Sequence, residues 1–439
     1  MLILRKAWRH IVKWREKIPI MAESLEPPAK RIKTQEEEQA EGNGVEENKS
    51  LLKRRKCALV IAYCGKGYMG MQMNPGVPTI EGELMTALWK AGAISEAHKD
   101  SQNKLGFQRC GRTDKGVSAA RQVVSLKMVP HQSMVSAINE HLPEQIRIIG
   151  LKRVSKSFNS KNACTSRLYE YLLPTYVFAP FKATNMDYRI TATEINRIQA
   201  LLNMYKGTHK FHNFTSGKKP TDPSCHRYIM SFVIGSPFVK NDLEFVSLNV
   251  EGQSFMIHQI RKMIGLVIAV VRGYMNDDAI TQAFEPPQTD IPRAPALGLF
   301  LDQVYYKSYN RRFGDDGVHE KLEWTEYEDT VSRFKDEYIY RHIIETELRE
   351  HVFLHWLHTL QLHDFYKSRQ DQSTTHTHAT EADSHTAEAD TLTTEADSHT
   401  AEADTHTTEA DLHTTEAGES TEDQTDAKTI AVADSESKI

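Results

Sequence analysis

Long hydrophobic runs and paired cysteines are both missing from this sequence. The longest apolar stretch, 263–271, falls short of the roughly 20 residues that a membrane-spanning helix needs, so no transmembrane segment is predicted. The five cysteines are odd in number and show no Cys-x-x-Cys spacing. This argues against a disulfide framework or a cysteine-rich zinc site and indicates a reducing compartment. A P-loop and a dinucleotide-binding fingerprint are also absent.

Acidic residues are outnumbered in the first 370 residues, although the whole chain carries a formal charge of −5. The segment from Asp371 to the end holds 18 acidic and 2 basic residues, a net −16, which leaves 52 basic and 41 acidic residues, a net +11, for 1–370. A basic body suits an acidic partner such as nucleic acid. Excess lysine is equally common on ordinary soluble domains, so charge alone leaves both interpretations open.

The N-terminal segment combines apolar residues at helical spacing with six lysines and arginines, and Glu16 is its only acid. Such a basic amphipathic helix is typical of a mitochondrial presequence, which we place at 1–21, followed by a disordered linker of mixed charge at 22–51. A start at Met21 would omit the presequence and leave basic clusters at 30–33 and 53–56 as nuclear-import candidates. We therefore expect a mitochondrial and a nuclear form, with the cytoplasm as a further compartment.

The C-terminal segment, 367–439, repeats a glutamate every seventh residue from Glu381 to Glu416. A heptad period suggests a coiled coil, but a coiled coil needs apolar residues at two positions of each heptad. Here alanine, threonine, aspartate and histidine fill the repeat. The sequence therefore predicts a disordered acidic tail.

Strand and helix patterns interleave between these tails without regular βαβ spacing, which favours the α+β class with a largely antiparallel sheet. An Asn-Asp pair at 241–242 predicts a hairpin turn. Strands are predicted at 57–64, 122–128, 146–154, 166–173, 228–234, 243–251 and 299–306. Thr79 precedes a helical pattern that runs to Lys90, as an N-terminal cap residue does. Further helices are predicted from 133 to 141, 193 to 207, 256 to 271, 327 to 340 and 341 to 360.

The segment Gly-Arg-Thr-Asp-Lys-Gly at 111–116 is a poor helix and a poor strand, yet it leads directly into a predicted strand. Its two glycines permit an unusual backbone path. Arg112 and Asp114 are two residues apart, so in an extended segment their side chains would point the same way and pair. Two interpretations are open on these residues alone. The pair could be structural, because an arginine often holds a loop carboxylate in place, or the carboxylate could be catalytic.

Two further segments carry residues that suit a nucleic-acid site. Tyr169 and Tyr171 lie on one face of a predicted strand, where their rings could stack on bases or pack into a core. His258 and Arg261 are three residues apart in a predicted helix, so they share a face. Arg261 could place a positive charge beside a buried carboxylate.

One histidine and cysteine set could in principle bind a metal, but its intervals match no known zinc module, and we expect polar loop residues and no metal. The set is His209, His212, Cys225 and His226.

Four motifs resemble those of the tRNA pseudouridine synthase A family. They are "GRTDKGVSA" at 111–119, "SRLYEYLLPT" at 166–175, "FMIHQIRKMIG" at 255–265 and "APALGLFL" at 294–301, in the family's order over some 190 residues. Further stretches such as "GTHKFHNFTS" resemble the eukaryotic pseudouridine synthase 1 branch. The resemblance covers about 52–366.

The resemblance implies a fold of two similar α/β subdomains that share one curved, mainly antiparallel mixed sheet. We place the N-terminal catalytic subdomain at 52–165 and the C-terminal one at 166–312. A helical extension at 313–366 completes the folded body, and because it would block the dimer interface of bacterial relatives, we expect a monomer.

The resemblance also implies roles for individual residues. Asp114 is the expected nucleophile or general base, and Arg112 would occupy the space that a flipped base leaves. Tyr169 would stack on the uracil and help to remove the C5 proton, and Arg261 would hold Asp114 ionised. The residues expected to bind substrate are Arg112, Lys115, Tyr169, Tyr171, His258 and Leu299.

Converting uridine to pseudouridine involves no redox change and no energy source, so we expect no cofactor. The implied partners are tRNA, in the anticodon stem-loop region, and other RNA such as small nuclear and messenger RNA, each with a flipped uridine, and no membrane. Two other interpretations stay open: a catalytically silent RNA-binding or chaperone protein, and an adaptor that binds partners through its acidic tail.

Overall fold

The computed structural model describes residues 53–286, 289–361 and 363. The predicted presequence, the linker at 22–51 and the whole predicted acidic tail at 367–439 therefore lie outside the described residues. Within the described part, no helix has both the length and the hydrophobicity that a bilayer crossing requires.

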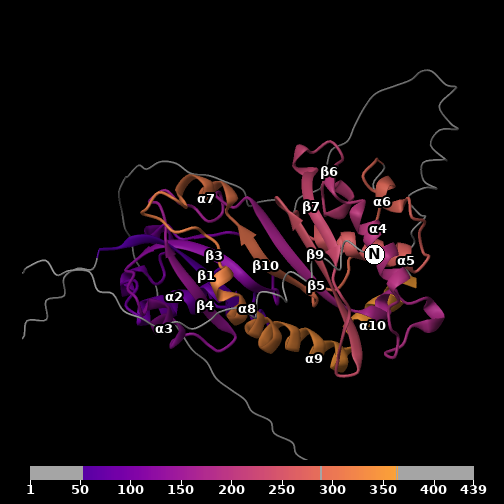
Figure 1. The fold of residues 1–439 in the computed structure, drawn as a ribbon, viewed down its shortest axis with the longest axis horizontal. Helices are drawn as coiled ribbons and strands as arrows, with labels where there is room; N and C mark the ends of the chain where they lie inside the picture. The colour runs from indigo at the N-terminus through magenta and orange to yellow at the C-terminus, as the bar shows by residue number, and fades with distance from the viewer. Residues whose placement is uncertain (1–52, 287–288, 362, 364–439) are drawn as a thin grey trace, which may run out of the picture. The chain divides into compact units, whose positions relative to one another are not determined.

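The strands form one ten-stranded sheet in the order β4-β1-β3-β10-β5-β9-β7-β6, with β2 paired to β3 and β8 to β9 (Figure 1). Every pairing between these strands is antiparallel except that of β10 with β3. The strand bounds are β1 Arg55–Tyr63, β2 Gln108–Arg109, β3 Ser118–Met128, β4 Ile146–Arg153, β5 Ser166–Pro174, β6 Gly207–Lys210, β7 His226–Ile234, β8 Phe238–Lys240, β9 Leu243–Gly252 and β10 Leu299–Tyr305.

Helices accompany both ends of the sheet. Helix α3 contacts β4, α4 contacts β7, and α8 contacts β3. This arrangement confirms the predicted α+β class with a mainly antiparallel mixed sheet and C-terminal helices. The helix bounds are α2 Ile80–Lys90, α3 Met134–Asn139, α4 Ala192–Asn203, α5 Gln259–Val271, α6 Ala279–Gln282, α7 Lys307–Phe313, α8 Glu328–Phe334, a π-helical segment Lys335–Tyr340, α9 Arg341–Glu350 and α10 Val352–Gln361.

Local capping explains where two helices begin. Thr79 caps α2 as predicted, because its hydroxyl accepts a hydrogen bond from the Gly82 amide at 3.2 Å. Helix α4 begins at Ala192, one residue before the predicted Thr193, because Thr191 and Glu194 form a reciprocal capping box. It also ends at Asn203, earlier than predicted.

The predicted start of the helix at 256 is wrong. His258 adopts a left-handed backbone conformation with φ of 64°, so α5 begins only at Gln259. The Gln259 side chain accepts a hydrogen bond from the Met256 amide at 2.9 Å, which closes the turn before the helix. His258 therefore caps α5 instead of lying on its face with Arg261.

The turn at Asn241 and Asp242 is present, and both residues have positive φ, as a tight hairpin turn requires. The strand that it joins to β9 is the short β8, which the sequence pattern did not reveal. The predicted partner, β7, pairs antiparallel with the same edge of β9, farther from the turn, while β5 occupies the other edge. The predicted hairpin is therefore confirmed, and β8 adds a short paired segment between β7 and the turn.

A buried charge network lies where β3, β10 and β5 meet. The Lys335 ammonium is 2.7 Å from a carboxylate oxygen of Glu170 on β5 and 3.0 Å from one of Asp302 on β10. Arg121 on β3 contacts Asp302 at 3.3 Å and Glu328 at 2.6 Å. Burial lowers the pKa of Lys335, but the two carboxylates outweigh this effect and the pKa is raised. Lys335 therefore fastens the C-terminal extension to the centre of the sheet.

We predict that Lys335→Met lowers the free energy of unfolding by about 3 kcal/mol, because it leaves the Glu170 and Asp302 carboxylates buried without their shared cation. Urea denaturation measures this change. The matched control is Lys307→Met, which removes an exposed pair with Glu251 at 3.6 Å and should cost less than about 1 kcal/mol. Equal losses in the two variants would contradict the role assigned to Lys335.

Candidate active site

The loop 111–117 connects β2 to β3 and is held at several points along its backbone. The Thr113 carbonyl accepts a hydrogen bond from the Met71 amide at 3.1 Å, and the Thr113 hydroxyl shares one with Tyr63 at 2.8 Å. Gly70 makes this approach possible, since a side chain there would meet the Thr113 carbonyl at 3.0 Å. Thr113 is thus buried, while its neighbours Arg112 and Asp114 are exposed.

Asp114 lies near three of the other predicted site residues. Burial raises the pKa of Tyr169 on β5 and lowers those of His258 at the start of α5 and Arg261 within α5. The negative charge of Asp114 adds to the rise at Tyr169 and opposes the fall at His258 and Arg261. Electrostatic influence of this kind requires proximity. The fold therefore brings together residues that are up to 147 positions apart in the sequence, as their numbers show.

Two hydrogen bonds to Ala294 hold Arg261 in place. Its Nε donates a hydrogen bond to the Ala294 carbonyl at 2.6 Å, and the Ala294 amide donates to the Arg261 carbonyl at 3.1 Å. Gly265 permits this packing, because a side chain there would lie 2.1 Å from the Pro292 carbonyl. Burial lowers the pKa of Arg261, and the Asp114 charge opposes that effect. Arg261 remains a fixed cation at neutral pH.

Tyr169 is half-buried and packs edge-on against Phe255, with ring centroids 5.3 Å apart. Burial raises its pKa to about 12, although the Arg167 guanidinium acts in the opposite direction. The phenol is therefore protonated at neutral pH. A neutral ring beside Asp114 is suited to stack on a base and to orient water, and it is not suited to act as a phenolate base.

Tyr171 lies deeper than its predicted stacking role requires. It is fully buried, its hydroxyl donates to the Pro295 carbonyl at 2.7 Å, and its ring meets the edge of Phe353. Burial raises its pKa. Its strand partner in the register, Leu299 on β10, is half-buried. Tyr171 thus forms part of the core beneath the site, and Leu299 lies closer to the surface.

The predicted pairing of Arg112 with Asp114 is wrong. Among the described residues no ion pair joins them, and Arg112 instead donates a long hydrogen bond to the Gln72 side chain at 3.5 Å. The turn of this loop begins only at Asp114, whose carbonyl accepts a hydrogen bond from the Val117 amide, and it contains Lys115. Arg112 and Lys115 are both exposed at the rim of the loop.

Two arginines of the site were missed in the sequence. Arg167 donates to the Cys110 carbonyl at 3.0 Å and to the Gln253 carbonyl at 2.9 Å, so it ties the start of the loop to the turn after β9. Arg293 lies 2.9 Å from the ring nitrogen Nε2 of His258. Arg167 stands inside a quoted motif and could have been found there, whereas nothing in the local pattern marks Arg293.

The positive surroundings act on His258. Burial, Arg293 and Arg261 lower its pKa, and Asp114 raises it. The net effect keeps His258 neutral at neutral pH, so its ring can accept the hydrogen bond from Arg293.

The comparisons with known proteins agree with this geometry. A family model described as tRNA pseudouridine synthase matches residues 201–307, a range that includes Arg261 and Leu299. The mouse (Mus musculus) pseudouridylate synthase 1 homolog is 49% identical over 348 residues, which are 78% of this chain and 80% of the relative.

Two other relatives extend the match. The human (Homo sapiens) pseudouridylate synthase 1 homolog is 51% identical over 312 residues, 70% of this chain and 73% of the relative. The tRNA pseudouridine synthase 1 of Yarrowia lipolytica is 36% identical over 388 residues, 68% of this chain and 73% of the relative. The chain belongs to the tRNA pseudouridine synthase family, as its four motifs predicted, and it is accordingly an enzyme of the isomerase class.

We predict opposite shifts in the pKa of His258 when the two neighbouring charges are removed. Arg261→Gln removes a cation that lowers this pKa, so the pKa should rise, whereas Asp114→Asn removes an anion that raises it, so the pKa should fall. NMR titration of the ring protons, assigned with His258→Gln, measures both.

Lys90→Gln, at the exposed end of α2, is the control and should leave the pKa of His258 unchanged. Shifts of the same sign in the Arg261 and Asp114 variants would contradict the described arrangement.

Proposed function

We propose that this protein converts uridine to pseudouridine in tRNA, with Asp114 as the group that acts on the sugar. The reaction breaks the bond between uracil N1 and ribose C1′ and joins C5 to C1′. A carboxylate beside the sugar either attacks C1′ or removes the 2′ proton, and an exposed Asp114 serves both routes. The observation that supports this assignment is the placement of Asp114 near the cation of Arg261 and the protonated phenol of Tyr169.

The surrounding residues supply the other requirements of the reaction. Arg261, anchored on the Ala294 carbonyl, favours the ionised form of a carboxylate nearby. The target base must leave its stack, and Tyr169 offers a half-buried ring on which it can be held. Arg112, free of Asp114 and exposed on the loop, can enter the space that the base vacates.

For the substrate, we propose uridines near the tRNA anticodon stem-loop, with small nuclear RNA and messenger RNA as further substrates. The names of the fungal relatives mention tRNA. The net +11 of residues 1–370 supports binding to an RNA backbone of any of these classes.

We predict that Asp114→Asn lowers the rate of pseudouridine formation at least about 10³-fold, because the amide can neither attack nor take a proton. The affinity for tRNA should stay within a few-fold, since binding is spread over many phosphate contacts. Purified protein and an unmodified tRNA transcript suffice for both measurements. Asp277→Asn, which alters an exposed carboxylate paired with Arg197 at 3.0 Å, is the control.

The assays of the wild type and of Asp114→Asn together distinguish a catalyst from a catalytically silent RNA-binding protein. Wild-type protein that binds tRNA without forming pseudouridine would support the catalytically silent alternative, and substantial turnover by Asp114→Asn would remove Asp114 from its role. Pseudouridine maps of RNA from cells that carry wild type or Asp114→Asn would then identify the uridines, and unchanged small nuclear and messenger RNA maps would refute the wider substrate range.

For the location, we propose that the form begun at Met1 enters mitochondria and that a form begun at Met21 enters the nucleus. One of the two candidate nuclear signals, 30–33, lies outside the described residues. In the other, 53–56, the last two residues belong to β1 and the Lys56 ammonium donates to the Gly106 carbonyl at 2.6 Å. The cluster at 30–33 is therefore the stronger candidate.

We predict that changing Arg5, Arg9 and Lys13 together to glutamate abolishes mitochondrial import, because it reverses the cationic face of the presequence. Fluorescence microscopy of a fusion to the full chain records the location. The charge-preserving control, Arg5→Lys with Arg9→Lys and Lys13→Arg, should import normally. A glutamate variant that still enters mitochondria would show that residues 1–20 are not a presequence.

A further inference from the structure

A cavity between α5 and the C-terminal extension borders the candidate active site. Its volume is about 480 Å³, which is within the range of pockets that hold small ligands. Three parts of the chain form most of its walls: the start of α5, the segment 290–293 and α10. Its polar side chains include Ser216, His258, Lys262, Asp290, Arg293 and His363.

Two cations line this cavity, and their hydrogen-bond partners are uncharged. The Lys262 ammonium donates to the Asn213 carbonyl at 3.1 Å and to the Thr215 carbonyl at 3.2 Å. Arg293 donates to the His258 ring at 2.9 Å, and that ring is neutral at neutral pH. In the part of the chain that the structure describes, neither cation forms an ion pair with a carboxylate. Both positive charges are therefore available to a ligand.

A single carboxylate, that of Asp290, opposes these cations among the described residues that line the cavity. Its side chain is 76% exposed, and its nearer oxygen lies 3.6 Å from the ring nitrogen Nε2 of His363. Burial lowers the pKa of Lys262, Asp290 opposes this effect and Arg293 adds to it. Because two like charges share one cavity, a bound anion would relieve their repulsion. The lining therefore favours an anionic ligand.

An aromatic ring also lines the cavity. Trp356 on α10 is half-buried, so part of its indole is accessible. Two neighbours on the same helix, Phe353 and Leu357, are buried in the core and hold the helix in place. A fixed indole can stack on a nucleobase of any sequence. Two cations and an accessible indole together suit a ligand that joins a phosphate to a flat base, which is a nucleotide.

The cavity and the candidate active site are built on the same two segments. Arg261, which belongs to the site, directly precedes Lys262 on α5. Ala294, whose carbonyl accepts from the Arg261 side chain at 2.6 Å, directly follows Arg293. His258 lies near the site and also lines the cavity. A nucleotide in the cavity would therefore be a neighbour of the nucleotide in the active site.

We propose that this cavity binds a nucleotide of the RNA next to the target uridine, with its phosphate on Lys262 and Arg293 and its base against Trp356. The proposal rests on the proposed function, since the target uridine is placed at Asp114. The arginine offers a fork of donors to the phosphate oxygens, and the lysine adds a compact charge. Through α10, the C-terminal extension would thus take part in binding the substrate.

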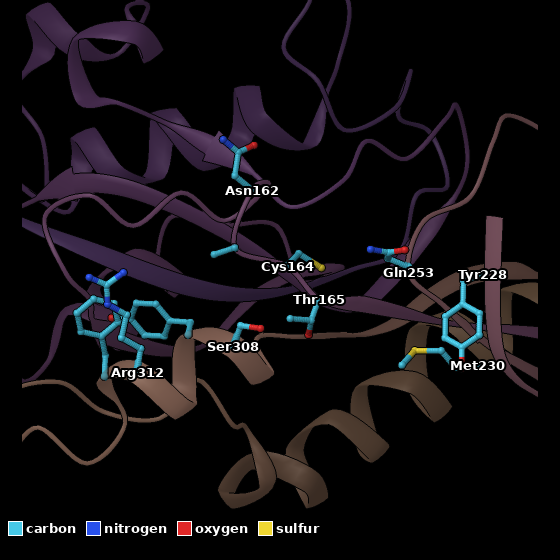
Figure 2. Close-up of a pocket in the computed structure, with 11 residues that line it drawn as sticks. Asn162, Cys164, Thr165, Tyr228, Met230, Gln253, Ser308 and Arg312 are labelled. Carbon is cyan, nitrogen blue, oxygen red and sulfur yellow. The ribbon is translucent and has the colours of Figure 1, made fainter. Parts of the chain in front are cut away.

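A different cavity, shown in Figure 2, supplies a control. Its volume is about 630 Å³, and the segment 162–165, β7 and α7 contribute to its walls. Among the described residues that line it, Arg312 is the only lysine or arginine. Arg312 lies over the ring of Phe313, 5.1 Å from its centroid. This cavity has no second cation with which Arg312 could share a phosphate.

The first experiment measures how the affinity for an unmodified tRNA transcript depends on salt, in full-length Asp114→Asn protein so that no product forms. Lys262→Gln combined with Arg293→Gln should reduce the slope of log affinity against log salt by about one, because the pair neutralises one phosphate. Arg312→Gln combined with Lys90→Gln removes the same charge elsewhere and should leave the slope unchanged. An unchanged slope in the cavity variant, or equal reductions in both, would overturn the proposal.

The second experiment tests the indole. Trp356→Leu keeps apolar bulk without a flat ring and should lower the affinity for tRNA about fivefold or more at an unchanged salt slope, whereas Trp356→Phe should stay within about twofold. Binding of tRNA should quench the tryptophan fluorescence, and Trp356→Phe should remove part of that quench. Equal affinities of the leucine and phenylalanine variants, or a quench that Trp356→Phe leaves unchanged, would overturn the proposal.

Inorganic phosphate and uridine 5′-monophosphate distinguish a free ligand from RNA. Quenching of Trp356 by either compound, with none by tRNA, would assign the cavity to a free ligand and overturn the proposal. The proposed function is judged separately. Wild-type protein that forms no pseudouridine would refute that function, while the salt slopes and the fluorescence would still decide whether RNA occupies the cavity.

Discussion

The contact of one ammonium with two buried carboxylates is the constraint on which the rest of this fold depends. Lys335 reaches Glu170 and Asp302 from the C-terminal extension, at the place where β10 is inserted between β3 and β5. Buried charges of this kind are costly unless each is paired. In the observed strand order, with the extension packed against the sheet, both buried carboxylates have cationic partners.

The candidate site is built on the same strands. Asp114 precedes β3, Tyr169 is the immediate neighbour of Glu170 on β5, and Leu299 begins β10. Arg261 enters from α5 and is fixed by the Ala294 carbonyl in the segment that leads to β10. An alternative pairing of β10 would thus separate the carboxylate, the ring and the cation at once. The stability of the region where β3, β10 and β5 meet and the order of the candidate site therefore both depend on this strand order.

Local features of the fold could be predicted from the sequence, and non-local ones could not. The Thr79 cap and the Asn241–Asp242 turn depend on neighbouring residues, and both were predicted. The left-handed His258 was not, because the residues around it read as a continuous helix. The sequence did not decide the burial of Tyr171 either. The alternation of side chains along a strand places Tyr169 and Tyr171 on one face of β5, but it does not show which part of that face the core covers.

The site residues themselves were identified through motif resemblance, and their contacts required the fold. The pairing of Arg112 with Asp114 failed because Arg112 donates to the Gln72 side chain instead. Arg293 and the network around Lys335 join segments far apart in the chain, and no local pattern marks them.

Amide hydrogen exchange in Glu170→Gln tests the central claim most directly. This change removes one carboxylate charge from the network around Lys335 and keeps a side chain of the same size that still accepts hydrogen bonds. We predict faster exchange in β5, β10 and the segment 335–340, with the protection of β1 and β4 unchanged, because opening begins where the network is weakened. Unchanged exchange in β5 and β10, or an equal increase throughout the sheet, would contradict it.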